Sequence, residues 1–174
     1  MTRIEVRRGD ITAEDCDAIV NAAQRSLLGG GGVDGAIHRA GGEAVLAACR
    51  ALRATTHPDG LPAGEAVATV AGDLRASWVI HTVGPQRWAH PDGGADLLAS
   101  CHSSSLGVAH SLGVRTIAFP AVSCGAYGWS ADDAAPVVVG AVRDWFAHNP
   151  VTTIEAVRFV LFNDEAHLAF ARQT

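Results

Sequence analysis

The chain of 174 residues is predicted to fold as an α/β protein whose sheet is covered by helices on both faces. Three observations support this prediction. Segments of strand character alternate with segments of helical periodicity along the chain. Some strand segments, such as Ala18-Ile19-Val20, are apolar throughout, which is typical of strands buried on both faces. No shift in composition marks a linker, so we expect one domain over residues 1–174.

The expected strands are short and are separated by turns or helices. They span residues 3–7, 16–22, 65–70, 78–83, 115–119 and 154–162. The first strand alternates between polar and apolar residues, whereas the fifth is expected to be buried and is stopped by Pro120, which cannot donate to a sheet.

The expected helices follow the apolar periodicity of 3.6 residues. They span residues 33–40, 43–51, 96–112, 132–148 and 164–172. Gly41 and Gly42 separate the first two helices, and Gly113 ends the third. We also expect a short turn through residues 13–15, with Thr12 as its cap.

Composition excludes several classes of protein. The net charge of −5 argues against an extended basic surface for nucleic acid. No apolar run reaches the length of a transmembrane helix, and the N-terminus lacks the apolar core of a signal peptide. The four cysteines form no C-x-x-C pair, so we expect neither a zinc site nor a disulfide framework. A cytoplasmic protein with reduced thiols and no metal cofactor is the expectation.

Four consecutive glycines, Gly29 to Gly32, stand directly before a predicted helix. Free backbone N–H groups and the helix dipole favour an anion at such a place. Asp34 lies in the first turn of that helix, and His38 follows one turn later on the same side. The alternative interpretation is a flexible loop in which Asp34 only favours the helix N-terminus.

Three loops follow predicted strands, at residues 9–12, 21–35 and 123–129. Ligands of α/β proteins bind beyond the carboxyl ends of strands, so these loops are expected to line one cleft. They lack both the G-K-[ST] of a P-loop and the G-x-G-x-x-G spacing of a dinucleotide fold.

Nearly the whole chain resembles a macrodomain, specifically the MacroD-type branch. The resemblance rests on motifs in the family order: Gly9-Asp10-Ile11-Thr12, Ile19 to Ala23, Gly29 to His38, His81 to Pro85, Phe119 to Ser123 and Gly125 to Gly128. It implies a three-layer α/β/α sandwich around a mixed six-stranded sheet. It also implies a cleft for ADP-ribose, and often hydrolysis of ADP-ribosyl esters without a cofactor.

The resemblance assigns ligand contacts to named residues. Asp10 and Ile11 would read adenine, since a carboxylate accepts from an exocyclic amino group. Phe162 would pack on adenine, with plain core packing as its alternative, and Asn163 is an adjacent alternative. The two phosphate loops and the distal ribose would be contacted by Gly30, Gly31, Gly32, Val33, Ser123, Cys124, Gly125, Ala126, Tyr127 and Asn21. We interpret Cys124, which stands where threonine is more usual, as a packing residue and not as a nucleophile.

The resemblance also assigns the chemistry. Asp34 would hold or deprotonate the water that attacks the ester. His38 would orient Asp34 or pack behind the loop. Gln24 departs from the family pattern, because the active branch usually has asparagine at this place, and its extra methylene would move the amide that contacts the distal ribose.

Two hypotheses follow for the function. The first is a hydrolase that removes mono-ADP-ribose from acidic side chains or deacetylates O-acetyl-ADP-ribose. The second is a reader that binds ADP-ribose without turnover, and Gln24 keeps it open. The expected partners are ADP-ribose and ADP-ribosylated proteins, with nucleic acid expected only as ADP-ribosylated ends, and a monomer is the expected state. His81 is expected to be a satisfied core histidine, and His102 and His110 ordinary helical residues.

Overall fold

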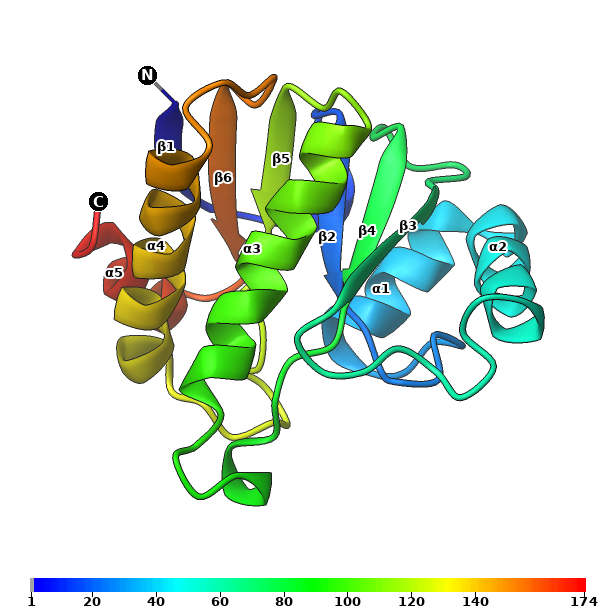
Figure 1. The fold of residues 1–174 in the computed structure, drawn as a ribbon, viewed down its shortest axis with the longest axis horizontal. Coiled ribbons are helices and arrows are strands. Elements are labelled where there is room, and N and C mark those ends of the chain that lie inside the picture. The colour runs from blue at the N-terminus through cyan, green and yellow to red at the C-terminus, as the bar shows by residue number, and fades with distance from the viewer. Residues whose placement is uncertain (1) are drawn as a thin grey trace.

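A computed structural model describes residues 2–174, which form one six-stranded sheet between two layers of helices (Figure 1). The strand order is β1-β6-β5-β2-β4-β3. Neighbouring strands are parallel except for β3 and β4, which are antiparallel, so the sheet is mixed, as the family resemblance implied. The strands are β1 Arg3–Arg8, β2 Ala18–Ala22, β3 Ala66–Val70, β4 Trp78–Thr82, β5 Thr116–Phe119 and β6 Ala156–Leu161.

All five predicted helices are present, with ends within a few residues of the predicted ones. They are α1 Gly32–Gly41, α2 Glu43–Ala54, α3 Ala95–Ser111, α4 Ala131–His148 and α5 Asp164–Ala171. Two short 3₁₀ helices accompany them, η1 Ile11–Ala13 and η2 Arg87–Ala89, and the second was not predicted. None of the helices described is both long enough and apolar enough to cross a membrane.

The main core lies between the sheet and the layer of α3, α4 and α5 (Figure 1). Phe159 of β6 is its aromatic centre, since its ring lies 5.9 Å from that of Phe119 and 5.1 Å from that of Phe170. In β2, Val20 faces this core while Ile19 faces the opposite one, which also holds Ile37 of α1. Successive strand residues point to opposite faces, so burial of both faces explains the uninterrupted apolar run.

His102 corrects one prediction, because it is not an ordinary helical position. His102 belongs to α3, and its side chain is fully buried on the side of the helix that faces the sheet. Its ring stacks on Phe119 with 4.9 Å between centroids. Nδ1 lies 2.8 Å from the carbonyl oxygen of Leu98, one turn earlier. Burial lowers the pKa of His102 to about 4, so the imidazole is neutral at pH 7.

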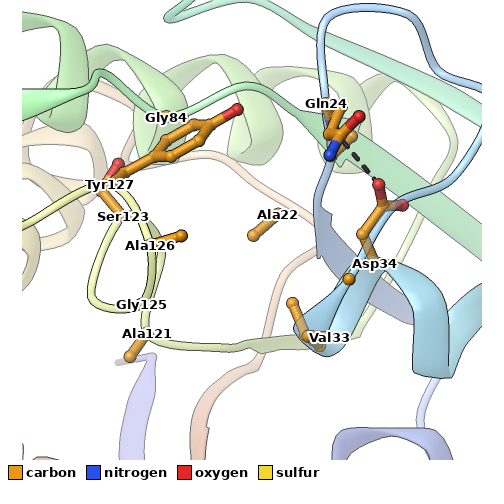
Figure 2. A pocket seen from close by; sticks show the side chains of 13 residues that line it. Ala22, Gln24, Val33, Asp34, Gly84, Ala121, Ser123, Gly125, Ala126 and Tyr127 are labelled. Carbon is orange, nitrogen blue, oxygen red and sulfur yellow. Dashed lines mark hydrogen bonds between the residues drawn. The ribbon is translucent and has the colours of Figure 1, made fainter.

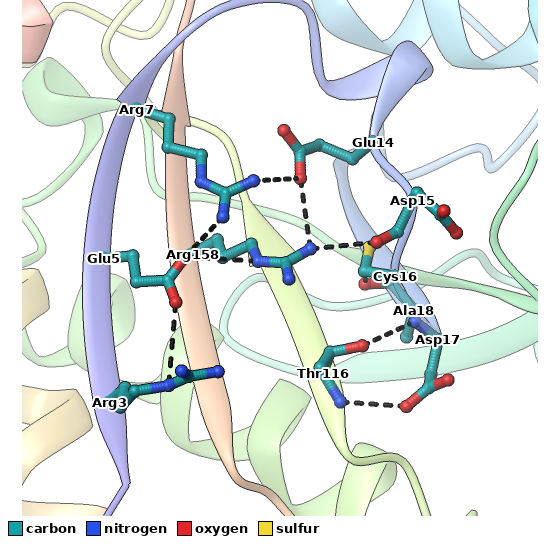
Figure 3. Close-up of polar contacts among 10 residues, drawn as sticks. All are labelled: Arg3, Glu5, Arg7, Glu14, Asp15, Cys16, Asp17, Ala18, Thr116 and Arg158. Atoms are coloured by element: carbon teal, nitrogen blue, oxygen red, sulfur yellow. Dashed lines mark hydrogen bonds and ion pairs between the residues drawn. The ribbon is translucent and has the colours of Figure 1, made fainter.

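The second face of the sheet is covered in two different ways. Helices α1 and α2 lie over its β2, β4 and β3 end (Figure 1). At the β1–β6 end, a charged cluster takes the place of a helix (Figure 3). Arg158 of β6 lies 3.4 Å from both Glu5 and Glu14 and donates to the carbonyl of Asp15 at 2.9 Å. The prediction of helices over both faces therefore holds for the rest of the sheet and not for this end.

The turn after β1 is capped by Asp10 and not by Thr12. The Asp10 carboxylate accepts from the backbone N–H of Thr12 at 2.9 Å and from its hydroxyl at 2.7 Å. An aspartate that bonds the backbone two residues on starts the turn earlier than a cap at Thr12 would. The turn therefore spans Ile11–Ala13, and the predicted cap and its residues 13–15 were wrong.

Candidate functional site

A cleft runs along the carboxyl ends of β2, β5 and β6, where the three predicted loops come together. It consists of two adjoining cavities with volumes of about 260 and about 620 Å³. The cavities are continuous because they share four lining residues: Gly32, Val33, Ala121 and Gly125. The cleft therefore lies where a parallel α/β sheet is expected to bind its ligand.

The smaller cavity is closed by the glycine loop on one side and by the loop after β5 on the other (Figure 2). Tyr127 stands on one wall, and Gln24 and Asp34 stand opposite it. A Cβ atom built on Gly31 or Gly125 would have no described protein atom within 4 Å apart from those of its chain neighbours, so the space beside both loops is open. Backbone N–H groups of such loops are suited to bind a pyrophosphate.

Asp34 is a buried carboxylate at the edge of this cavity, with 3% of its surface exposed. One oxygen, Oδ1, accepts from Nδ2 of Asn21 at 2.8 Å. The other, Oδ2, accepts from the backbone N–H of Gln24 at 3.3 Å (Figure 2). These donors fix the orientation of the carboxylate, while each oxygen keeps a lone pair for a further donor.

Two histidines lie behind Asp34. His38 Nε2 is 3.4 Å from Asp34 Oδ1 but lacks hydrogen-bond geometry, and its ring packs 3.6 Å from where a Gly29 Cβ would stand. His81 is fully buried, with Asn21 Nδ2 at 3.1 Å from Nδ1 and Thr69 Oγ1 at 2.9 Å from Nε2. Burial and the neighbouring His38 lower the pKa of His81 to about 3. The prediction of a satisfied core histidine at His81 is confirmed.

The loop after β5 is held in a strained conformation by its contact with the loop after β4. Ser123 has a φ of +65°, which is rare outside glycine, and its hydroxyl donates to the carbonyl of Pro85 at 2.9 Å. Gly84 leaves the necessary room, because a Cβ there would stand 2.1 Å from Ser123 Oγ. Next to Ser123, burial and the charge of Glu165 raise the pKa of the Cys124 thiol to about 12. Cys124 is therefore protonated at neutral pH and unsuited to be a nucleophile.

The larger cavity is lined by Asp10, Ile11 and Phe162, among other residues. Phe162 is 78% exposed, so it is not a core residue, and its carbonyl accepts from Arg8. The side chain of Asn163 caps α5 by accepting from the N–H of Ala166 at 2.8 Å. A cavity lined by both an exposed phenyl ring and a carboxylate suits a flat ligand that carries an amino group.

Most of the predicted site residues line this cleft, while Asn21, Gly30 and His38 do not. Asn21 is fully buried behind Asp34, and Gly30 lies beneath the amide of Gln24. Sequence reasoning missed several lining residues, among them Gly84 in the smaller cavity and Arg39 and Trp129 in the larger one. Among residues 2–174, no group of three or more His, Cys, Asp or Glu side chains is placed to hold a metal ion.

Comparison with known proteins identifies the family. The model of the Macro domain matches residues 20–138. A Macro domain-containing protein of Streptomyces nogalater is 57% identical over 99% of this chain and 92% of its own length. A protein of Klebsiella pneumoniae named O-acetyl-ADP-ribose deacetylase is 47% identical over 97% of this chain and 94% of its own length.

A solved structure agrees with these relatives. A point variant of the Oceanobacillus iheyensis macrodomain, determined with ADPR (ADP-ribose), superposes with a TM-score of 0.93 at 35% identity. The match covers 99% of this chain and 91% of that one. The order of the sheet, the cleft between the two loops and these four matches lead to one conclusion: the chain belongs to the Macro domain family.

Proposed function

We propose that this chain binds ADP-ribose in the cleft and hydrolyses ADP-ribosyl esters. The observation that carries the proposal is Asp34, a buried carboxylate held by two donors at the edge of the smaller cavity. The substrates are O-acetyl-ADP-ribose, proteins that carry mono-ADP-ribose on an acidic side chain, or both. The deacetylase name of the Klebsiella pneumoniae relative supports the first of these.

The two cavities of the cleft support an arrangement in which adenine lies in the larger one and the distal ribose in the smaller one. The larger cavity offers Asp10 and the exposed ring of Phe162 to adenine. The shared residues lie between the two glycine-containing loops, where backbone N–H groups suit the pyrophosphate. The smaller cavity then receives the distal ribose between Tyr127 and Asp34 (Figure 2).

In this arrangement Asp34 acts on a water molecule. The water oxygen forms a bond with the acyl carbon, and the bond between that carbon and the ribose oxygen breaks. The products are a carboxylic acid and ADP-ribose with a free hydroxyl. Asp34 orients the water, takes up its proton and passes that proton to the ribose oxygen as it leaves, which restores the carboxylate. Such a general-base role is worth typically 10²- to 10⁴-fold in rate. A phosphate of the substrate helps to place the same water.

A single-turnover assay tests the proposal. Two substrates would be used: a protein that carries ADP-ribose on a glutamate, and O-acetyl-ADP-ribose. Each would be incubated separately with the parent chain, with Asp34→Asn and with Asp34→Ala. We expect release of ADP-ribose by the parent and a rate at least about 100-fold lower in both variants. Asp34→Asn is the matched control for volume, because it keeps the side-chain shape and removes the basic oxygen.

Binding is measured in the same samples by calorimetry. ADP-ribose binding without release by the parent would make the chain a reader, and Gln24→Asn would be the next protein to build. Equal rates for the parent and Asp34→Asn would overturn the role of Asp34. Absence of ADP-ribose binding would overturn the proposed ligand.

A further inference from the structure

A chain of hydrogen bonds runs behind Asp34 through the interior of the sheet. Asn21 of β2 contacts Asp34 Oδ1 at 2.8 Å and His81 Nδ1 of β4 at 3.1 Å. His81 Nε2 lies 2.9 Å from the hydroxyl of Thr69 in β3, and that hydroxyl donates to the carbonyl of Val70 at 3.0 Å. The four side chains are all buried, and the exposed fraction of Asn21 and of His81 is 0%.

The register of the sheet makes this chain possible. Asn21 and His81 are direct partners in the parallel pair of β2 and β4. Their side chains therefore leave the sheet on the same face, which is the face covered by α1. Asp34 in the first turn of α1 meets them there.

The chemistry of the groups fixes the direction of each hydrogen bond. A carboxylate only accepts, so the Asn21 amide must present Nδ2, its donor, to Asp34. The second N–H of the same nitrogen points to His81, so Nδ1 must accept and the imidazole carries its proton on Nε2. Nε2–H then donates to Thr69, whose own proton goes to Val70.

We propose that His81 is a positioning residue, which holds the Asn21 amide in the one orientation that donates to Asp34. Without an acceptor at Nδ1, the second N–H of the Asn21 amide is buried and unpaired, so the amide shifts toward another acceptor. Asp34 then loses the geometry of one of its two donors and with it part of its orientation. This inference rests on the proposed function, in which Asp34 orients the attacking water. It adds a residue that does not line the cleft.

The environment of His81 supports this role. Burial in the sheet lowers the pKa of His81 to about 3, which keeps the imidazole neutral. An imidazolium would donate from both nitrogens and would face the Asn21 amide nitrogen with a second donor. Asn21 Oδ1 is buried and accepts no hydrogen bond from any residue between 2 and 174, so nothing else described holds the amide on its oxygen side.

Two substitutions of His81 separate positioning from packing. His81→Asn keeps an oxygen near the place of Nδ1 and loses the contact with Thr69. His81→Gln keeps a donor near the place of Nε2 and loses the acceptor for Asn21. Both substitutions remove the ring, so both are expected to destabilise the fold. Urea unfolding measures the loss of stability, and the activity assay is run at a temperature at which both variants remain folded.

We expect His81→Gln to lower kcat for the ADP-ribosyl ester about 10- to 100-fold, in line with a misplacement of about 1 Å. His81→Asn is expected to stay within about 5-fold of the parent, and the Kd of ADP-ribose to change less than about 3-fold in either variant. In an Asn21→Ala background, His81→Gln should have no further effect on kcat, because His81 acts through Asn21.

Each remaining outcome overturns a defined claim. Equal losses of kcat in the two His81 variants, or a full effect of His81→Gln in the Asn21→Ala background, would overturn the positioning role alone. A parent chain without turnover would overturn the proposed function, and this inference with it.

Discussion

At the scale of single residues, Gln24 shows how one side chain depends on a glycine beneath it. A Cβ built on Gly30 would stand 2.5 Å from Gln24 Nε2 and 3.1 Å from Asp34 Oδ2. We predict that Gly30→Ala displaces the Gln24 amide from the cavity, because the end of a glutamine is mobile and backbone is not. The affinity for ADP-ribose should then fall about 2- to 10-fold, the value of one hydrogen bond.

Gln24→Ala is the reference for this prediction, since it removes the same amide without adding a Cβ at Gly30. Calorimetric titration should give the same loss of affinity for both single variants, and no further loss when they are combined. An additional loss in the double variant would mean that the new methyl group acts on Asp34 or on the ligand directly.

The sequence predicted the residues of the site whose role is local. The glycines of the first loop and Asp34 in the first turn of α1 could be found from spacing, whereas the role of Asp10 after β1 was assigned through the family resemblance. The chain from Asn21 to His81 and Thr69 could not be found in this way, because it joins residues 60 and 12 positions apart across neighbouring strands. Its visible signal is weak: a polar residue near the end of each of two apolar strands.

At the scale of elements, the charged cluster on β1 and β6 replaces a covering helix (Figure 3). The side chain of Arg158 is 14% exposed and that of Glu14 is 13% exposed. Removal of one partner of a fully buried pair costs roughly 3–5 kcal/mol, because the other charge is left without compensation. The residual exposure reduces this cost, so we predict that Arg158→Met lowers the free energy of unfolding by about 2 kcal/mol.

Arg115→Met is the matched control for Arg158→Met. Arg115 pairs with Glu155 at a shorter distance, 2.6 Å, but the two side chains are 67% and 57% exposed. An exposed pair contributes about 0–1 kcal/mol, so this variant should unfold at nearly the same urea concentration as the parent. A larger cost for Arg115→Met than for Arg158→Met would show that burial does not set the strength of these pairs.

The sequence predicted where the strands and helices lie, but it did not predict this charged cluster. Period and composition located all six strands and all five helices, because each has a hydrophobic face or a continuous apolar run. The charged face of β1 and β6 was not predicted. Glu5 and Arg158 are far apart in sequence and become neighbours only when β1 and β6 pair in the observed register. The turn η2 lies in a segment of Trp, His, Pro and Gly without apolar periodicity, which gives no helical signal.

At the scale of the whole molecule, two neutral imidazoles are buried on opposite faces of the sheet. His81 faces α1, and His102 lies between α3 and Phe119. Burial lowers the pKa of the first to about 3 and of the second to about 4, against an ordinary value of 6.5. The folded protein therefore takes up these protons only in strong acid, whereas the unfolded chain takes them up near pH 6.5.

Stability should consequently fall as the pH decreases from about 6.5 toward the folded values. In this window the unfolded state binds more protons than the folded state, and each histidine contributes a slope of up to about 1.4 kcal/mol per pH unit. From pH 7.5 to pH 5, each imidazole should remove about 2 kcal/mol of the free energy of unfolding, and the pair about 4 kcal/mol. Most carboxylates remain charged at pH 5, so this loss precedes ordinary acid denaturation.

Urea unfolding of the parent and of His102→Asn at several values between pH 7.5 and pH 5 tests this prediction. The asparagine amide keeps a donor for the carbonyl of Leu98 and has no proton to gain. The variant should be less stable than the parent at pH 7.5 because it loses the ring that stacks on Phe119, but it should lose only about half as much stability over the interval. Parallel curves for the two proteins would mean that His102 is protonated in the folded state as readily as in the unfolded chain.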